Sequence, residues 1–291
     1  MFNAIKSPYL VPFDGSFQRK NFDTEPPDSR LDKQDYKRLL GDLSQELDDS
    51  QRMLYAQDRY AVLLIFQGMD ASGKDSTIRA VMNGVDPAGC QVYSFKQPSV
   101  HDLDHDFLWR TAVCLPERGR IGIFNRSYYE EVLAVRVHPG YLEAQRLPDK
   151  IKLARLWLER MESINDHERH LARNGTVILK FWLNISKGEQ RKRFLSRIDE
   201  PHKNWKFAES DVREREHWSA YMRAYQSALA ATSREWAPWY AIPADHKPYM
   251  HYCVADIIVQ SLKTLGLTYP RIDAAQEKKL QRMRKLLVKD R

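Results

Sequence analysis

Five short apolar runs alternate along the chain with longer amphipathic segments. The runs cover 61–66, 91–95, 121–124, 176–186 and 239–245. The first and third are apolar at nearly every position, which is typical of strands buried on both faces. Strands that alternate with helical segments predict an α/β fold in which helices sandwich a parallel sheet.

Helical periodicity fills the segments between these runs, including a pair of helices expected over 187–198 and 208–233. Residues 1–30 contain four prolines and few periodic apolar positions, so we expect an extended arm on the surface or on a neighbouring subunit. The chain is therefore predicted to form one large domain over 31–265, followed by a basic helix over 271–291.

The first strand leads into GMDASGK (68–74), and the next residues have a helical pattern. A glycine-rich turn between strand and helix can surround phosphate with backbone N–H groups, and the helix dipole and Lys74 add positive charge. A turn that only joined the two elements would not need the lysine. The motif predicts a phosphate-binding loop, whose binding residues are Gly68, Met69, Ala71, Ser72, Gly73, Asp75 and Ser76.

Two acidic residues make this loop unusual. Asp75 stands where NTPase loops normally have the Ser or Thr that binds Mg²⁺, and Asp70 lies inside the loop. A carboxylate beside phosphates is repelled unless a cation lies between them. We therefore interpret Asp70 as a metal ligand or as a group that orients an incoming phosphate; the alternative is a cap at the helix N-terminus.

Further candidates follow the second and third strands. Lys96, in a proline turn, would suit the phosphate or base of an acceptor. Arg110 is a further candidate for nucleotide binding, and the pattern leaves the direction of its side chain open. The third strand ends in Asn125, where enzymes of this layout have an acidic Mg²⁺ ligand; an amide oxygen can still ligate the ion, less strongly. Arg126 can clamp phosphates in a bidentate manner.

A pocket for the acceptor nucleotide is expected near these strand ends, with Tyr129 and Glu130 beside it. One of Glu130 and Glu131 would face this pocket, although a charge preference at a helix start explains both residues equally well.

Between the fourth and fifth strands, 191–206 carries six basic and two acidic residues. If this segment returns over the phosphate-binding loop, it forms a basic lid, which we place at about 187–233. Arg193 and Arg197 are four positions apart and would share one helix face. With Lys206 they are candidate phosphate ligands, and a solvated charged face is the alternative.

Composition narrows the possible partners. The 291 residues have a net charge of +7, and the tail 271–291, with eight basic and three acidic residues, supplies most of it. The tail has no aromatic platform for bases, so we expect no nucleic-acid role. Three widely spaced cysteines fit a reduced cytoplasm. We expect no signal peptide and no membrane span.

These features together predict phosphoryl transfer with Mg²⁺, in which positioning and charge neutralisation supply most of the catalysis. The sequence offers no evident Ser-His-Asp or Cys-His arrangement and no obvious general base. A phosphate oxygen of a nucleotide is already largely ionised at neutral pH, so such a nucleophile needs no strong base. The reaction instead requires cations that hold two polyanions end to end.

Several motifs resemble the polyphosphate kinase 2 family: GMDASGKDSTIRAVM, SFKQPS, LDHDFLWR, FNRSYYEEVLAVRVH, FWLNISKGEQRKRFLSRI, NWKF and APWYAIPADHK. The resemblance is collinear over about 31–265. It implies a P-loop kinase core similar to thymidylate kinase, with a parallel five-stranded sheet and a helical basic lid. It also implies Mg²⁺-dependent, reversible transfer between inorganic polyphosphate and nucleotides.

The resemblance assigns roles to individual residues. Asp70, Lys74 and Arg126 fall on the catalytic positions, and the lid's Arg193, Arg197 and Lys206 fall where the family's basic lid meets polyphosphate. Asp70 and Asn125 are the expected metal ligands.

One departure narrows the expectation further. The motif Asn125-Arg126-Ser127 stands where many members have Asp-Arg-Ser, and glutamates follow it, which resembles the subgroup often called class III that accepts both AMP and ADP. Asp70 would then carry more of the metal binding. The expected partners are polyphosphate and purine nucleotides (AMP, ADP and ATP), for a cytoplasmic homodimer or homotetramer. An ATP-dependent nucleoside monophosphate kinase and a nucleotide-gated binding module are the alternatives.

Overall fold

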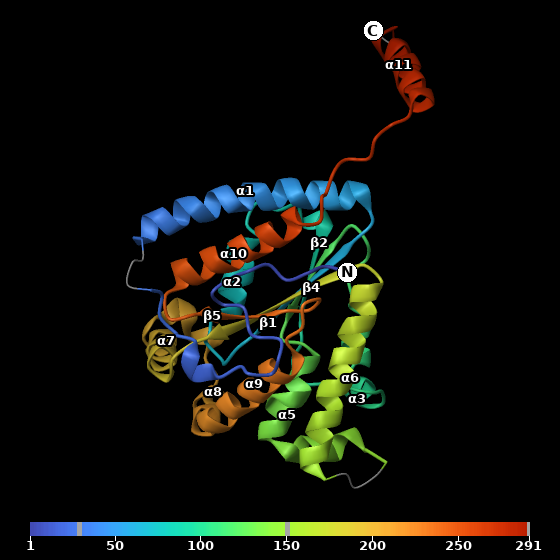
Figure 1. Ribbon diagram of the computed structural model, residues 1–291. Helices are drawn as coiled ribbons and strands as arrows, with labels where there is room; N and C mark the ends of the chain where they lie inside the picture. The colour runs from blue at the N-terminus through green and yellow to red at the C-terminus, as the bar shows by residue number, and fades with distance from the viewer. Residues whose placement is uncertain (28–30, 149–151, 290–291) are drawn as a thin grey trace.

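The computed structural model describes residues 1–27, 31–148 and 152–289. Its centre is a five-stranded, all-parallel sheet with strand order β2-β3-β1-β4-β5 (Figure 1). The strands are β1 (Ala61–Gln67), β2 (Cys90–Ser94), β3 (Ile121–Asn125), β4 (Thr176–Asn184) and β5 (Trp239–Pro243). The predicted α/β fold is confirmed. The strand that leads to the phosphate-binding loop is the central one, so its position is the most constrained.

Helices cover both faces of the sheet (Figure 1). One face carries α1 (Lys33–Gln57), α2 (Lys74–Val81) and α10 (Lys247–Lys263), and the other carries α5 (Ala134–Val137), α6 (Leu153–Arg173) and α9 (Trp218–Thr232). The side chain of Asp32 caps α1 by accepting from two backbone N–H groups of its first turn. Leu47 and Leu54 of α1 are fully buried, as its apolar periodicity predicts.

The remaining helices are short or lie outside these two layers. They are α3 (Val100–Leu103), α4 (Trp109–Ala112), α7 (Lys187–Asp199), α8 (Glu209–Glu214) and α11 (Ala274–Lys289). Short 3₁₀ helices span Arg19–Asn21, Pro87–Gly89, Tyr128–Val132, Pro139–Gln145, Pro201–Lys206 and Arg215–His217. No helix among the described residues is long and apolar enough to cross a bilayer.

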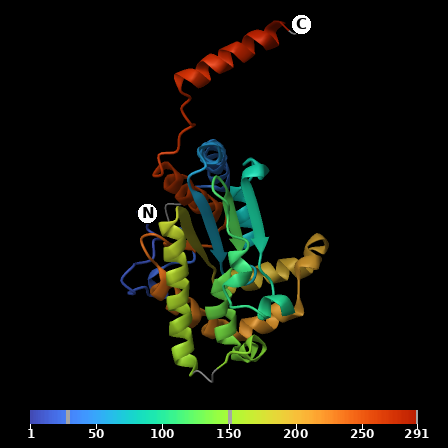
Figure 2. The ribbon, with the colours of Figure 1, turned by 90° about the vertical axis from the view of Figure 1, so that its right-hand side faces the viewer.

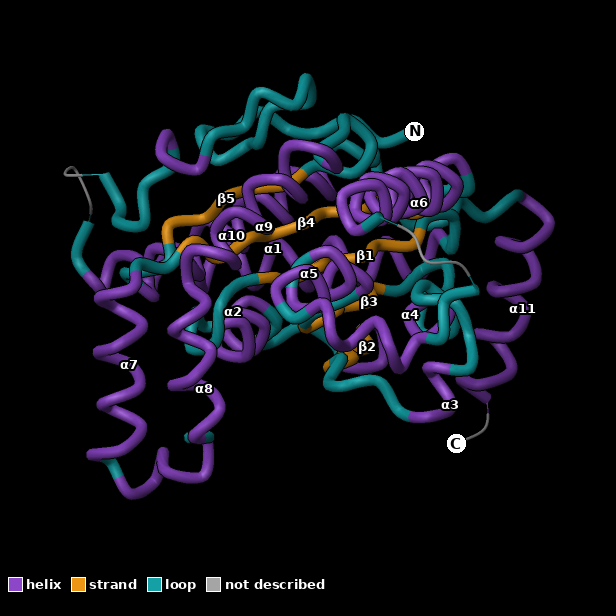
Figure 3. Tube along the Cα trace, turned by 90° about the horizontal axis from the view of Figure 1, so that it is seen from below, coloured by secondary structure: helices purple, strands orange, loops and turns teal. Residues whose placement is uncertain are grey.

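Helices α7 and α8 project from the body as a hairpin (Figure 3). The single helix expected over 208–233 is instead broken by the 3₁₀ turn Arg215–His217. At this break Glu214 accepts a hydrogen bond from the hydroxyl of Tyr221 and pairs with His138, the residue just before the 3₁₀ helix Pro139–Gln145. Helix α9 beyond the break packs into the core, so only 187–214 projects from the body, and the lid remains a prediction.

The arm at the N-terminus lies against the protein's own sheet. The backbone N–H of Val11 donates to the carbonyl of Trp239 (2.9 Å), and that of Ala241 donates to the carbonyl of Tyr9 (2.8 Å). Val11 and Phe17 are buried. The arm therefore covers the sheet edge at β5, which would otherwise expose unpaired backbone groups.

Helix α11 has a different environment. It extends away from the body at the end of a connecting segment (Figures 1 and 2), and each of its described residues is exposed.

Candidate active site

The phosphate-binding loop joins β1 to α2 and depends on its two glycines. Gly68 has φ of 156°, and an added Cβ would lie 2.7 Å from the hydroxyl oxygen of Ser72. Gly73 has φ of 109°, and an added Cβ would lie 2.9 Å from the terminal methyl of Met250. Both positions combine a left-handed backbone with close contacts, so a side chain at either would strain the loop.

Lys74 is buried at the start of α2. Its Nζ donates to the carbonyl oxygens of Gly68 (2.7 Å) and Met69 (3.3 Å), so it closes the loop on itself. Burial and then the charge of Arg126 lower the pKa of Lys74 to about 8, while nearby carboxylates oppose this shift. A bound anion would therefore strongly stabilise the charged form of this buried ammonium.

Arg126 follows β3 and faces the loop. It has φ of 64°, an uncommon conformation for a residue with a side chain, which the surrounding structure must hold. Its Nη2 lies 2.5 Å from Oδ1 of Asp70, and its Nη1 lies 3.6 Å from Oε2 of Glu130. The carboxylate of Glu130 raises the pKa of Arg126, and that of Asp70 makes a smaller contribution in the same direction. The guanidinium therefore stands between two carboxylates at the mouth of the loop.

The alternative interpretation of Asp70 as a helix cap is wrong. The N-cap of α2 is Gly73, and no side chain caps this helix. The carboxylate of Asp70 is instead directed to Arg126, and its backbone carbonyl accepts from Nε2 of Gln190 on α7 (2.9 Å). Asp70 is thus positioned from both sides of the loop.

Asn125 and Asp75 form a side-chain pair. Nδ2 of Asn125 donates to Oδ1 of Asp75 at 2.5 Å. The two positions that looked unusual in the sequence therefore meet in space: the acidic group lies on the helix after Lys74, and the neutral amide lies at the strand end. Through this bond the amide orients the carboxylate of Asp75.

The donor set of the loop bears on Mg²⁺. Within the described part of the chain, no three His, Cys, Asp or Glu side chains converge on a point that could hold a metal ion. Two carboxylates, those of Asp70 and Asp75, border the loop. Mg²⁺ in phosphate-transfer sites commonly takes one or two carboxylates and completes its shell with substrate phosphates and water. The residues fit an ion that binds together with substrate.

The expectation that Arg193 binds polyphosphate needs correction. Arg193 is buried, and all five of its N–H donors reach protein acceptors. These acceptors are Oε1 of Glu189 and the backbone carbonyls of Ala71, Ser72, Ala244 and Asp245. The guanidinium thus fastens the phosphate-binding loop to α7 and to the end of β5. It has no donor left for a substrate.

Arg197 and Lys206 lie on the lid, in α7 and in the 3₁₀ helix that follows it. Nη1 of Arg197 donates to Oδ2 of Asp211 and to the carbonyl of Lys206, both at 3.1 Å. The side chain of Lys206 is exposed and lies over the indole of Trp205. By their spacing Arg193 and Arg197 lie on one face of α7, as expected. Arg193 is buried beneath the loop, whereas Arg197 is partly buried and pairs with Asp211.

Asp211 on the lid was missed by sequence reasoning. Burial raises its pKa, and the charge of Asp70 contributes to the same shift, which indicates that α8 faces the loop. Tyr225 of α9 was also missed; it is buried and lies against the backbone of Gly68. No sequence pattern marks Asp211 or Tyr225. Gln190, which contacts the backbone of Asp70, was missed too, although it lies in the basic segment KGEQRKR.

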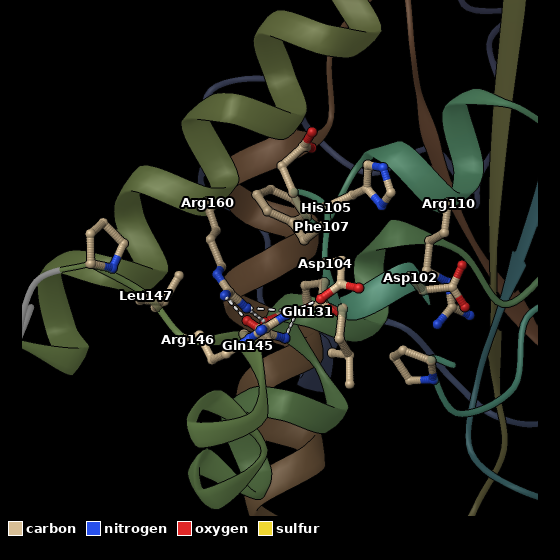
Figure 4. A pocket seen from close by; sticks show the side chains of 14 residues that line it. Asp102, Asp104, His105, Phe107, Arg110, Glu131, Gln145, Arg146, Leu147 and Arg160 are labelled. Carbon is tan, nitrogen blue, oxygen red and sulfur yellow. Dashed lines mark hydrogen bonds and ion pairs between the residues drawn. The ribbon is translucent and has the colours of Figure 1, made fainter. Parts of the chain in front are cut away.

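A cavity of about 570 Å³ lies beside the strand ends (Figure 4). Residues of 98–110, the segment 145–148, Glu131 and Arg160 line it. Arg160 is buried and pairs with Glu131 at 2.7 Å, and its guanidinium lies over the ring of Phe107. Of the two glutamates, Glu131 lines this cavity, while Glu130 faces Arg126.

Arg110 and Lys96 are in contact with each other near this cavity. Nη2 of Arg110 donates to the carbonyl of Lys96 at 2.7 Å, and its guanidinium lies over the ring of Phe95. Arg110 lines the cavity, whereas the side chain of Lys96 is exposed.

Tyr129 does not face the site, which corrects another expectation. It is fully buried, its hydroxyl donates to Oε1 of Glu168 (2.9 Å), and it accepts from Nζ of Lys180 (2.9 Å). Lys180 and Glu168 form an ion pair with no exposed side-chain surface. Tyr129 therefore belongs to a buried network beneath the site.

Comparisons with known proteins show the family of the chain. The family model "Polyphosphate kinase 2" matches residues 30–268. The chain is 53% identical over 258 residues to an ADP-polyphosphate phosphotransferase from Rhodopseudomonas palustris, covering 88% of this chain and 89% of the relative. It is 42% identical over 273 residues to an AMP/ADP-polyphosphate phosphotransferase from Meiothermus ruber, covering 93% and 97%.

A solved structure supports the same assignment. The crystal structure of polyphosphate kinase 2 from Arthrobacter aurescens superposes with a TM-score of 0.82 at 36% identity, covering 96% of this chain and 98% of that one. The extent of these matches includes the loop, the lid and every strand of the sheet. The chain therefore belongs to the polyphosphate kinase 2 family.

Proposed function

We propose that this protein transfers phosphoryl groups reversibly between inorganic polyphosphate and the adenine nucleotides AMP and ADP. The observation that carries the proposal is that basic side chains lie on two sides of the phosphate-binding loop: at the loop itself and on the lid. Lys74 and Arg126 lie in and beside the loop, and Arg197 and Lys206 lie on the lid that faces it. Two polyanions can meet end to end only where cations offset their repulsion.

The relatives support the choice of substrates. The relative from R. palustris is named for ADP, and the relative from M. ruber is named for both AMP and ADP. This chain shares family membership with both, and its Asn125-Arg126-Ser127 motif with following glutamates is the feature that favours both acceptors.

The reaction requires the chain's residues to position phosphates and to neutralise charge. The backbone N–H groups of the loop and Lys74 bind one phosphate chain, and Arg126 holds the carboxylate of Asp70 toward the incoming phosphate. The attacking phosphate oxygen is already ionised, so no side chain has to remove a proton. We propose that Asp70 and Asp75 would hold Mg²⁺, with Asn125 orienting Asp75. When bound, the ion would supply positive charge that offsets the charge of the phosphates.

The acceptor's base has a separate place to bind. The 570 Å³ cavity beside the strand ends is large enough for a small ligand, and Phe107 supplies an apolar surface in it. Carboxylates of Asp102, Asp104 and Asp106 line the same cavity and can accept hydrogen bonds from exocyclic amino groups. We propose that the nucleotide base occupies this cavity.

The first test is a substrate panel. AMP, ADP, GMP and GDP are each incubated with long-chain polyphosphate and Mg²⁺ in the absence of ATP. We expect ATP to form from ADP, and ADP followed by ATP to form from AMP, measured by separation of the nucleotides. An ATP-dependent nucleoside monophosphate kinase would form no new anhydride under these conditions, and a binding module would show no turnover.

The lid supplies a second test. Arg197→Ala is expected to raise the KM for polyphosphate by about tenfold, because a charge-assisted contact is lost, and to change the KM for ADP little. Arg191→Ala is the matched control, since Arg191 is exposed on the outer side of the same helix. An equal rise of both KM values would show that the lid does not bind the donor.

We further propose a cytoplasmic homodimer or homotetramer. The cysteines are free thiols, as is usual in a reducing compartment. The arm is engaged with its own sheet, which leaves the exposed apolar side chains Leu280, Met283 and Leu287 of α11 as a candidate subunit contact.

A further inference from the structure

Helix α11 has two opposite faces. Lys278, Arg282, Lys285 and Lys289 follow one another at spacings of four, three and four residues, so they lie on one side of the helix. We call these four residues the basic ridge. Leu280, Met283 and Leu287 lie on the opposite side. A subunit contact through the apolar side would therefore leave the basic ridge open to solvent.

The basic ridge is a linear array of positive charge. It extends over about 16 Å, given the helical rise of 1.5 Å per residue. Glu277 is the one acidic residue of α11. An array of this kind matches a linear polyanion with regularly spaced charges, since each contact releases counterions.

The basic ridge lies far from the site already described. In Figure 1, α11 and the lid helices α7 and α8 are at opposite ends of the molecule. A short oligophosphate bound at the loop cannot reach α11, whereas a long chain can contact both places at once. Binding at two linked places raises the effective concentration of the chain at each of them.

We propose that the basic ridge of α11 is a second binding site for polyphosphate, which tethers a long chain to the protein outside the active site. This inference rests on the proposed function for the identity of the polyanion. The absence of aromatic side chains from α11 argues against a platform for nucleic-acid bases.

The test compares two variants with the same change of charge. In the ridge variant, K278Q, R282Q, K285Q and K289Q are combined; glutamine is a good helix former, so α11 is retained. In the control variant, K6Q, K33Q, K37Q and R173Q remove four charges from exposed residues elsewhere. Equilibrium binding of labelled long-chain and short-chain polyphosphate is measured for the full-length proteins without nucleotide, and then KM and kcat are measured with ADP.

The ridge variant is expected to lose affinity for the long chain by at least about tenfold, because the second contact is lost. The dependence of log affinity on log salt is expected to become shallower by about three, for four contacts. The KM for the short chain, the KM for ADP and kcat should stay unchanged. The control variant should behave like the wild type, and light scattering should give both variants the mass of the wild type.

Three results would overturn the proposal. The first is equal long-chain affinity in the ridge and control variants. The second is an equal loss for short and long chains, which would place the effect in the active site. The third is displacement of polyphosphate from the ridge by RNA or anionic lipid vesicles at lower charge concentration. If binding depends on the ridge but no transfer to nucleotides occurs, the proposed function fails while the second site stands.

Discussion

Replacing Lys74 by alanine is expected to lower kcat for phosphoryl transfer by about 10³-fold, because a positioned cation that stabilises transferring phosphates is removed. Lys74 lies at the start of α2, and its Nζ reaches the loop carbonyls of Gly68 and Met69. Burial lowers the pKa of Lys74 to about 8, and a phosphate beside the buried ammonium would stabilise its charged form. Steady-state kinetics with ADP and long-chain polyphosphate measure the effect.

The control for this variant must separate chemistry from folding. The alanine variant should keep the circular dichroism spectrum and a melting temperature close to that of the wild type, because the loop remains fastened by Arg193. Lys192→Ala, at a largely exposed lid position, is the matched loss of one lysine. A Lys74 variant that retained most of its kcat would remove the loop from the mechanism.

Replacing Lys180 by methionine is expected to reduce the free energy of unfolding by about 3–5 kcal/mol, because it leaves a buried carboxylate without its partner. All three N–H donors of Lys180 are used, by Glu168, by the hydroxyl of Tyr129 and by the carbonyl of Thr232. Lys180 and Glu168 have no exposed side-chain surface. Denaturant unfolding of the wild type and the variant measures the difference.

The double variant Lys180→Met/Glu168→Leu supplies the control. Removing both charges leaves no uncompensated ion, so this variant should recover part of the stability lost by the single substitution. A double variant less stable than the single one, or a single variant within about 1 kcal/mol of the wild type, would contradict the account.

The buried network also connects stability to function. Glu168 of α6 accepts from the hydroxyls of Tyr128 and Tyr129, which lie in the 3₁₀ helix that follows Arg126. This arrangement ties that helix to α6, β4 and the end of α9. The backbone that carries Arg126 and Glu130 is therefore positioned from the core, which is consistent with the left-handed φ of Arg126 being maintained.

A signal for this network was present in the sequence. Lys180 interrupts TVILKFWLN, a strand that is otherwise apolar and is buried along almost its whole length. A lysine in such a strand is rarely buried without a partner, so an acidic residue facing it could have been predicted. The identity of that acidic residue could not have been predicted, because Glu168 lies on a different element and the direction of its side chain depends on packing.

Local pattern alone predicted the glycine-rich loop, the five strands and the residues at the strand ends, and the collinear motifs indicated the family that the comparisons then showed. These features are readable because glycines with required conformations, apolar runs and a lysine after the loop are local properties of the chain. The pairing of Asn125 with Asp75 was not foreseen, although both residues had been singled out as unusual.

Only the tertiary structure decided which candidate side chains are held by other parts of the protein. Arg193 and Arg197 look equivalent on one helix. Arg193 donates hydrogen bonds to backbone carbonyls of the loop, whereas Arg197 bonds to the carbonyl of Lys206 on the lid. Tyr129 follows the site in sequence but turns into the core. The physical reason is the same in each case: a side chain's chemistry is set by its type, but its partners are set by packing between elements that are distant in sequence.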